Sequence, residues 1–177
     1  MRSQEISQKL RMSNLTQDLN SQDEHCRSNA YRDILTLADD GDGDAMFQVA
    51  RCLNLGLGVE TNPLKADYWL RRACSASPAS ANALYTYGMQ HLSKKRPDAD
   101  VTKGISYIER AASSGLVKAI LQQVSMVENG LLHIKPDLHR AFRLLATATA
   151  TIRDAQLHKA YLSFCERHQP ISNLLDS

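Results

Sequence analysis

The strongest constraint on the fold of this chain is a set of residues that recurs 38 positions further along. Lys65 and Ala66 return as Lys103 and Gly104, and Trp69 returns as Tyr107. The same offset relates three further sets: Ala73-Cys74 to Ala111-Ala112, Ala45 to Ala83, and Val49-Ala50 to Tyr87-Gly88. A fixed period of this size indicates a repeat array, in which each unit buries its apolar face against its neighbours.

One repeat is predicted to be a helix, a glycine-containing loop and a second helix. Asp44 is expected to cap the first helix, and Gly56 and Gly58 allow a tight exit because glycine tolerates positive φ. Asn62-Pro63 then starts the second helix as N-cap and first helical residue. Apolar residues at helical spacing form one buried stripe on each helix: Ala45, Val49, Cys52 and Leu53 on the first, and Ala66, Trp69, Leu70 and Ala73 on the second.

The repeat extends in both directions from this copy. A second copy runs from Ser80 to Ser114, and a third from Ala119 to Ala148, with one residue lost in a loop. A helix ending near Gly41 leads the array, and residues 154–168 form a closing half repeat. We therefore expect an all-α, right-handed superhelical α-solenoid of about eight helices over residues 29–168. Residues 1–28 are predicted to be flexible, with a partly helical segment as the alternative, and residues 169–177 a tail.

The first copy resembles the Sel-1-like repeat (SLR), a relative of the tetratricopeptide repeat with a period of about 36 to 38 residues. The resemblance rests on Ala45, Val49, Ala50, Leu53, Gly56-Leu57-Gly58-Val59, Lys65-Ala66, Trp69 and Ala73-Cys74. The second copy has Lys94-Lys95-Arg96-Pro97 where the glycine loop belongs, and the third keeps only Gly130. The resemblance implies a non-enzymatic adaptor, often bacterial, that binds other proteins along a concave groove.

Composition excludes several classes of function. A net charge of +2, with acids and bases interspersed, does not favour a nucleic acid or an acidic membrane as partner. The sequence has no apolar run that indicates a signal peptide or a transmembrane helix, and its four cysteines are widely spaced. We expect a cytoplasmic protein with reduced thiols, although a basic loop at 94–96 leaves RNA binding as a remote option.

Stacked helix pairs offer an extended groove that suits peptides or helices better than metabolites. The side of each first helix opposite the buried stripe supplies the candidate partner-binding residues. In the three copies these are Phe47, Gln48, Arg51 and Asn54; Tyr85, Thr86, Met89 and Leu92; and Leu121, Gln122, Ser125 and Glu128. The apolar members could instead be buried by neighbouring helices.

Motifs for chemistry are absent from the sequence. Residues 40–44 begin like a calcium loop, but Ala45 and Arg51 stand where glycine and a bidentate glutamate are required. The six histidines form no zinc pattern, and no nucleophile elbow or phosphate loop occurs. We expect no enzyme activity, no cofactor and no metal.

Two hypotheses of function follow. In the first, the protein is an adaptor or regulator that captures a partner protein or peptide in its groove, for example as an inhibitor or as a dedicated chaperone of a secreted protein. In the second, it is a structural protein that forms a homodimer through an array end or its N-terminal segment.

Overall fold

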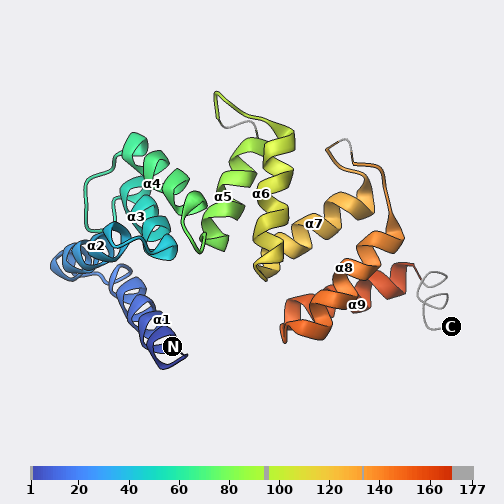
Figure 1. Ribbon diagram of the computed structural model, residues 1–177, viewed down its shortest axis with the longest axis horizontal. Helices are drawn as coiled ribbons and strands as arrows, with labels where there is room; N and C mark the ends of the chain where they lie inside the picture. The colour runs from blue at the N-terminus through green and yellow to red at the C-terminus, as the bar shows by residue number, and fades with distance from the viewer. Residues whose placement is uncertain (1, 94–95, 133, 169–177) are drawn as a thin grey trace. The chain divides into compact units, whose positions relative to one another are not determined.

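The computed structural model describes residues 2–93, 96–132 and 134–168, and these residues form nine α-helices without a β-strand (Figure 1). The chain is an all-α solenoid of helical repeats. It divides into two compact units, residues 1–87 and 88–177, and the boundary falls within the fifth helix. The helices are α1 (Arg2–Asp18), α2 (Glu24–Asp39), α3 (Gly43–Leu55), α4 (Pro63–Ser75), α5 (Ala81–Leu92), α6 (Val101–Ser113), α7 (Val117–Asn129), α8 (Leu138–Thr151) and α9 (Ala155–Arg167).

The positions of the helices confirm the period that the sequence predicted. α3 and α5 begin at Gly43 and Ala81, and α4 and α6 begin at Pro63 and Val101, so both pairs keep the offset of 38. The third pair departs from it because the connection between α6 and α7, residues 114–116, is shorter than the connection between α4 and α5, residues 76–80. α7 therefore begins two residues earlier than the period requires, and α8 begins one residue earlier. The shift of one residue at α8 is the one that the sequence indicated.

Side-chain caps fix where the helices begin. Asn62 accepts a hydrogen bond from the Lys65 amide and Pro63 occupies the first turn of α4, as predicted. The prediction for α3 was wrong by two residues, because its cap is Asp42 and not Asp44. The Asp42 carboxylate accepts from the amides of Asp44 and Ala45, both at 2.9 Å. Asp42 can do this because its backbone is extended, which turns the carboxylate toward the first free amides of the helix.

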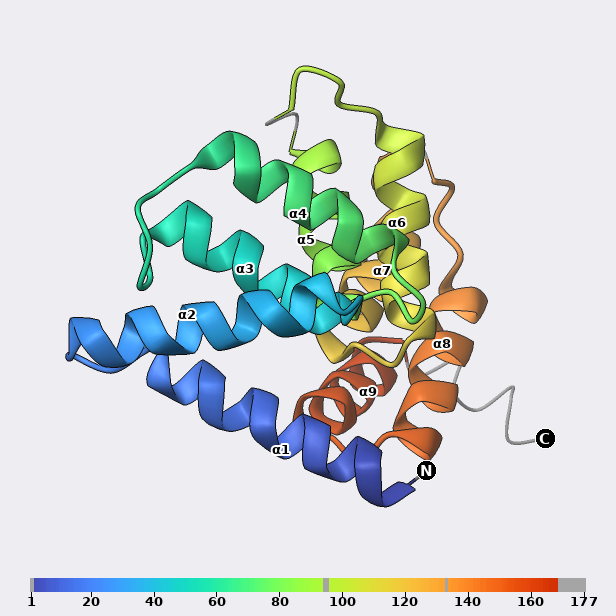
Figure 2. The same ribbon diagram turned by 60° about the vertical axis from the view of Figure 1, so that its left-hand side comes forward.

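The first unit contains the main departure from the expected fold. The sequence favoured a flexible segment at residues 1–28, whereas the structure has helix α1 over Arg2–Asp18, which packs on α2 (Figure 2). Leu15 and Leu19 bury their side chains, at 8% and 1% exposure. α2 in turn packs on α3, so α1 and α2 stand as a further helix pair in front of the first recognised copy.

The core of the first unit otherwise follows the predicted stripes, with one correction. Val49, Cys52 and Leu53 of α3 are buried, as is Leu70 of α4. Trp69, expected to point inward, is only half-buried. The guanidinium of Arg72 lies over its ring, 4.6 Å from the centroid, and Tyr68 packs edge-on against it. One face of the Trp69 ring thus contacts a cation and not the apolar core, so the side chain lies at the boundary of the core.

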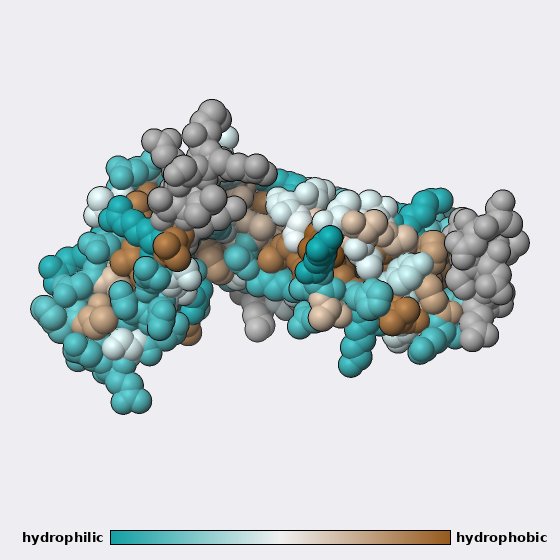
Figure 3. All heavy atoms as spheres, turned by 90° about the horizontal axis from the view of Figure 1, so that it is seen from below, coloured by the Kyte–Doolittle hydropathy of each residue, from teal (hydrophilic) through white to brown (hydrophobic). Residues whose placement is uncertain are grey.

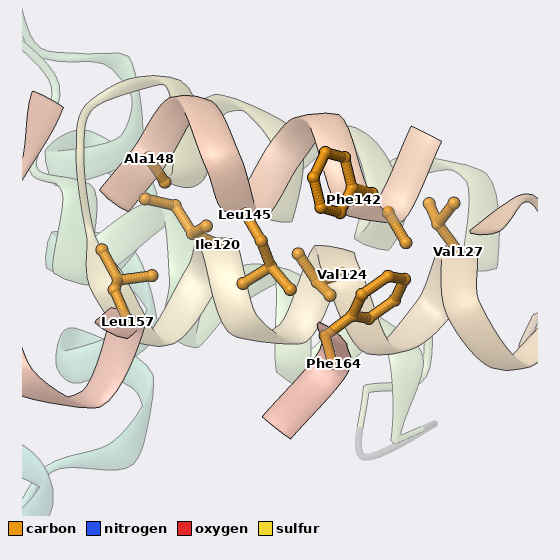
Figure 4. Close-up of a cluster of buried hydrophobic side chains, with 9 residues drawn as sticks. Ile120, Val124, Val127, Phe142, Leu145, Ala148, Leu157 and Phe164 are labelled. Atoms are coloured by element: carbon orange, nitrogen blue, oxygen red, sulfur yellow. The ribbon is translucent and has the colours of Figure 1, made fainter. Parts of the chain in front are cut away.

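The second unit is held by a continuous apolar cluster from three helices (Figure 4). Its residues are Ile120, Val124 and Val127 of α7, Ala141, Phe142, Leu145 and Ala148 of α8, and Leu157 and Phe164 of α9. The Phe142 and Phe164 rings are tilted against each other with centroids 6.2 Å apart. α9 thus closes the cluster as the predicted half repeat, and the tail expected at 169–177 lies outside the described residues.

Candidate functional site

In the first unit, the candidate stripe of α3 leads into a hollow. We call it the Phe47 hollow; its volume is about 620 Å³. It is formed where the starts of α3 and α5 meet one side of α1. The residues that line it include Met12, Ser13 and Thr16 of α1, Asp44, Phe47 and Gln48 of α3, and Ser80 and Asn82 at the start of α5.

The repeat explains why these residues share one surface. Asp44 and Asn82 are equivalent positions 38 apart, and each lies three residues before an aromatic candidate, Phe47 or Tyr85. Residues three and four apart on a helix lie on the same face, so the hollow adjoins the candidate stripes of both α3 and α5. This places two of the predicted residues, Phe47 and Gln48, in the wall of the hollow.

The walls of the hollow are fixed by close contacts. The Ser80 hydroxyl donates a hydrogen bond of 2.6 Å to the Asp44 carboxylate, which ties the start of α5 to the start of α3. Gly43 lies so close to the segment before α5 that an added Cβ would be 2.7 Å from the Pro78 carbonyl oxygen. The wall that α3 and the start of α5 form is therefore preformed, and its rim carries carboxylate, hydroxyl and amide groups around the Phe47 ring.

The other predicted residues of α3 lie beside the hollow and not in its wall. Arg51 is half-buried and its guanidinium donates to the Gln48 side-chain oxygen at 2.7 Å, which orients that amide. Asn54 is exposed at the far end of the helix. The stripe thus runs from an aromatic and polar hollow to a solvated end.

The candidate residues of α5 are divided between the two units. Tyr85 and Thr86 are half-buried in the first unit, and Met89 is half-buried in the second. Leu92 packs on Gly104 of α6, which is the burial by a neighbouring helix that the sequence left open for the apolar candidates. A Cβ on Gly104 would be 2.6 Å from a Leu92 methyl carbon. Gly104 stands where the first copy has Ala66, and the missing methyl group makes room for Leu92.

On α7, two of the four candidate residues contact other parts of the second unit. Leu121 packs against the apolar cluster. Glu128 accepts from Arg167 at 2.8 Å and lies 3.0 Å from a His168 ring nitrogen, which secures the end of α9. Burial alone would raise the pKa of Glu128, but the hydrogen bonds from Arg167 and His168 outweigh it and lower the pKa. Gln122 and Ser125 remain half-buried candidates.

Sequence reasoning missed most of the residues that line the Phe47 hollow. Asp44 and Asn82 could have been found by extending each stripe by one helical turn toward its N-terminus. Met12, Ser13 and Thr16 carry no such signal, because α1 lacks a continuous apolar stripe in the sequence and is placed by tertiary packing.

A metal site requires converging ligands, and a reactive thiol requires a lowered pKa. The described residues contain no group of three or more His, Cys, Asp or Glu side chains that could hold a metal ion. Burial raises the pKa of the Cys52 thiol to about 11, which keeps it protonated at neutral pH and unreactive. In the basic loop, Arg96 donates to Asp98 at 3.0 Å and to Gln90 at 3.1 Å, while Lys94 and Lys95 lie outside the described residues.

No helix in the part of the chain that the structure describes has the length and apolar character needed to span a bilayer.

Comparisons with known proteins agree with the geometry. The Sel1 repeat family model matches residues 43–78, 81–116 and 125–150, which is more than half of the chain. Among solved structures, a Sel1 repeat protein from Oxalobacter formigenes is similar, with a TM-score of 0.64 and 26% identity over 75% of this chain and 96% of that protein. No match is found among curated proteins.

A second solved structure is similar in fold alone. It is c5321, a protective antigen present in uropathogenic Escherichia coli strains that displays an SLR fold. The TM-score is 0.61 at 12% identity, over 80% of this chain and 30% of that protein.

Proposed function

Because the chain belongs to the Sel1 repeat family, whose repeats serve as scaffolds for protein interactions, we propose that it binds a partner protein through the Phe47 hollow and the stripes beside it. The residues of this surface are Phe47, Gln48, Arg51, Asn54, Tyr85 and Thr86 in the first unit. In the second unit, Met89, Gln122 and Ser125 are proposed as partner-binding residues in their own right. The protein acts by holding its partner and performs no chemical step.

The observation that carries this proposal is the preformed wall of the Phe47 hollow. A half-buried aromatic ring is surrounded there by fixed polar groups, among them Asp44, Gln48 and Asn82. Partner side chains that enter such a hollow gain apolar contact with the ring and hydrogen bonds at the rim, which is the composition expected of an interface centre. The preformed wall lowers the ordering cost of binding.

Site-specific photocrosslinking tests the proposal. A photoreactive amino acid is placed at Phe47 or Tyr85 and, as a matched control, at Leu64 of α4, an apolar side chain that is 85% exposed. We expect the same partner to crosslink from positions 47 and 85 and not from position 64. Crosslinking only from position 64, or equally from all three, would contradict binding at this surface.

The finer form of this function is a cytoplasmic regulator, either an inhibitor or a dedicated chaperone of a secreted protein. The two forms differ in what the purified chain does to its purified partner. An inhibitor reduces the partner's activity at stoichiometric concentration, whereas a chaperone suppresses aggregation of the partner during refolding. If neither quantity changes although the complex forms, the role is that of an adaptor. Fractionation of cells that express the chain tests the location, and we expect the cytoplasmic fraction.

Self-assembly is the second candidate function, and the exposed apolar side chain of Leu10 favours it. Leu10 of α1 is 62% exposed, and α1 is the first helix of the array. A homodimer formed through α1 would bury this side chain. Light scattering across a dilution series tests the dimer, which the substitution Leu10→Glu should dissociate. A monomer at tens of micromolar would rule it out.

A further inference from the structure

The second unit contains another hollow, which none of the predicted partner-binding residues lines. It has a volume of about 600 Å³ and lies between the end of α6, the start of α7 and one face of α8. We call it the Arg143 hollow. In Figure 3, the right-hand part of the molecule, which carries α8 and α9, shows brown and pale residues among teal ones.

The hollow has an apolar floor. Ile120 of α7 and Ala148 of α8 line it and are buried, at 6% and 7% exposure. Leu144 and Ile152, which are half-buried, extend the apolar surface along α8. The spacing of four residues between 144, 148 and 152 puts these side chains in one row. Such a floor accepts one or two large apolar side chains.

The charged residues that line the hollow have one sign, although the Glu109 carboxylate lies next to one of them. Arg140 and Arg143 are the charged residues that line it, and no carboxylate lines it within the part of the chain that the structure describes. Arg140 has a weak ion pair with Glu109, at 3.4 Å with both side chains about half exposed. The described residues offer no ion pair to Arg143, which is exposed at the rim.

Several of the remaining polar groups of the hollow have hydrogen-bond partners within the chain, and the neutral side chains of Gln123 and Thr147 also belong to its lining. At the end of α6, the carbonyl groups of Arg110, Ala111 and Ala112 accept from the amides of residues 114, 116 and 115. The Ser113, Ser114 and Thr151 hydroxyls donate to carbonyl groups of their own helices. The strongest groups left to recognise a ligand are therefore guanidinium donors, which prefer carboxylates.

From the apolar floor and the cationic rim together, we infer that the Arg143 hollow binds an acidic, leucine-containing segment of a partner protein. The apolar side chains of the segment lie on Ile120, Leu144 and Ile152, and its carboxylates pair with Arg143 and Arg140. The inference shares one assumption with the proposed function, namely that the chain binds a partner protein. Its surface is separate from the Phe47 hollow, so the two can fail independently.

Fluorescence anisotropy with a defined peptide tests the inference. The probe is a fluorescein-labelled peptide of about 12 residues with two leucines four positions apart, flanked by glutamates, and its twin has glutamine for every glutamate. We expect the full chain to bind the acidic peptide with a Kd of about 10 to 100 μM. We expect the twin to bind at least about tenfold more weakly, since electrostatic complementarity is lost.

Three charge-changing variants of exposed residues locate the binding site. Arg143→Glu and Thr147→Glu place a carboxylate in the hollow and should each weaken binding of the acidic peptide by about tenfold or more. Lys159→Glu on α9 makes the same charge change as Arg143→Glu away from the hollow and should change the Kd by less than about twofold. Amide chemical shifts in the bound state should change at residues 112–115 and 140–152.

Several outcomes would overturn the inference. The chain could bind the acidic peptide and its glutamine twin with equal affinity. Lys159→Glu could weaken binding of the acidic peptide as much as Arg143→Glu does. The chain could also fail to bind the acidic peptide at about 1 mM. Competition by free glutarate with the same affinity as the peptide would show a site for small anions. Weakening by Phe47→Ala as large as that by Arg143→Glu would place the probe in the other hollow. Intact binding by Phe47→Ala supports the inference and leaves the proposed function to its own test.

Discussion

At the scale of single residues, Gly58 shows how the loop of the first copy depends on glycine. Its φ is +69°, and an added Cβ would collide with the Arg27 carbonyl of α2. Gly41 also has positive φ, +99°, but nothing lies near its Cβ position. Substitution of Gly41 therefore measures the cost of backbone strain alone, whereas substitution of Gly58 measures strain together with steric contact.

We expect Gly41→Ala to lower the free energy of unfolding by about 1 kcal/mol, the cost of backbone strain alone. Gly58→Ala should cost about 2 kcal/mol more, because the collision with Arg27 forces α2 and the loop apart. Urea denaturation of both variants measures the difference. Equal losses would mean that the loop does not contact α2 as described.

The half-buried position of Trp69 changes the expected cost of removing it. A fully buried tryptophan would lose about 3 to 5 kcal/mol on replacement by alanine. With Trp69 half-buried under Arg72, we expect about 2 kcal/mol for Trp69→Ala, and about 2 to 5 kcal/mol for Leu70→Ala, which is 5% exposed. Thermal unfolding of the two variants ranks them. A clearly larger loss for Trp69→Ala would contradict this description of the core.

His91 makes the stability of the second unit depend on pH. It is 2% exposed, its Nδ1 accepts from the Asp100 amide at 3.1 Å, and its ring stacks on Tyr107. Burial lowers the pKa of His91, and the charge of Arg96 lowers it further. The folded state thus favours the neutral ring, whereas the unfolded chain takes up the proton at about pH 6.5.

Because the pKa of His91 is lower in the folded state, its contribution is complete above about pH 6.5 and is lost as the pH falls toward the folded pKa. We expect the free energy of unfolding to decrease from pH 7.5 to pH 5.5 more in the native protein than in His91→Gln. Glutamine can still accept from the Asp100 amide but does not titrate. Identical pH dependence in the two proteins would show that His91 is not the group responsible.

At the scale of elements, α1 is attached to α2 through few buried side chains among those that the structure describes. Leu15 of α1 and Leu19, which directly follows the helix, are buried, while Leu10 is exposed. We expect Leu19→Ala to cost about 2 to 4 kcal/mol and to speed amide exchange over residues 10–19. Leu64→Ala on α4, where the side chain is 85% exposed, is the control and should leave exchange over these residues unchanged. Similar exchange in both variants would mean that α1 is not docked through Leu19.

The sequence predicted the elements well where the repeat is regular and poorly where it is not. The stripe Ala45, Val49, Cys52 and Leu53 is buried as expected, because periodic apolar residues determine which face of a helix packs. α1 corresponds to the partly helical alternative for residues 1–28 and not to the favoured flexible segment, because its polar composition gives only a weak helical signal. Leu92 packs within its own helix pair because the change from Ala66 to Gly104 leaves room for its side chain.

The candidate site was predictable only in part for a related reason. The register gave Phe47 and Gln48, which line the hollow, because each repeat presents equivalent positions on the same face. The hollow itself arises where α1, the start of α3 and residues 78–82 converge. A sequence period describes neighbours within a repeat and does not describe such convergence of separate segments.

At the scale of the whole molecule, the copies share contacts within their helix pairs but differ in their loops. Trp69 and Tyr107 are equivalent, and in both copies an arginine three residues later lies over the ring, Arg72 at 4.6 Å and Arg110 at 5.5 Å. The loops differ, since Gly56 and Gly58 both have positive φ in the first copy whereas residues 94–97 replace them in the second. We propose that partner specificity lies where the copies differ.

The central claim is that the protein works by binding a partner through the stripe that begins at the Phe47 hollow. Quantitative affinity capture from the native extract, with Tyr85→Ala and Arg51→Glu beside the unchanged protein, tests it most directly. We predict that both variants lose one specific partner while the melting temperature stays within about 5 °C, and that Leu64→Ala retains the partner. Recovery of the same partner at unchanged yield by both Tyr85→Ala and Arg51→Glu would contradict the claim.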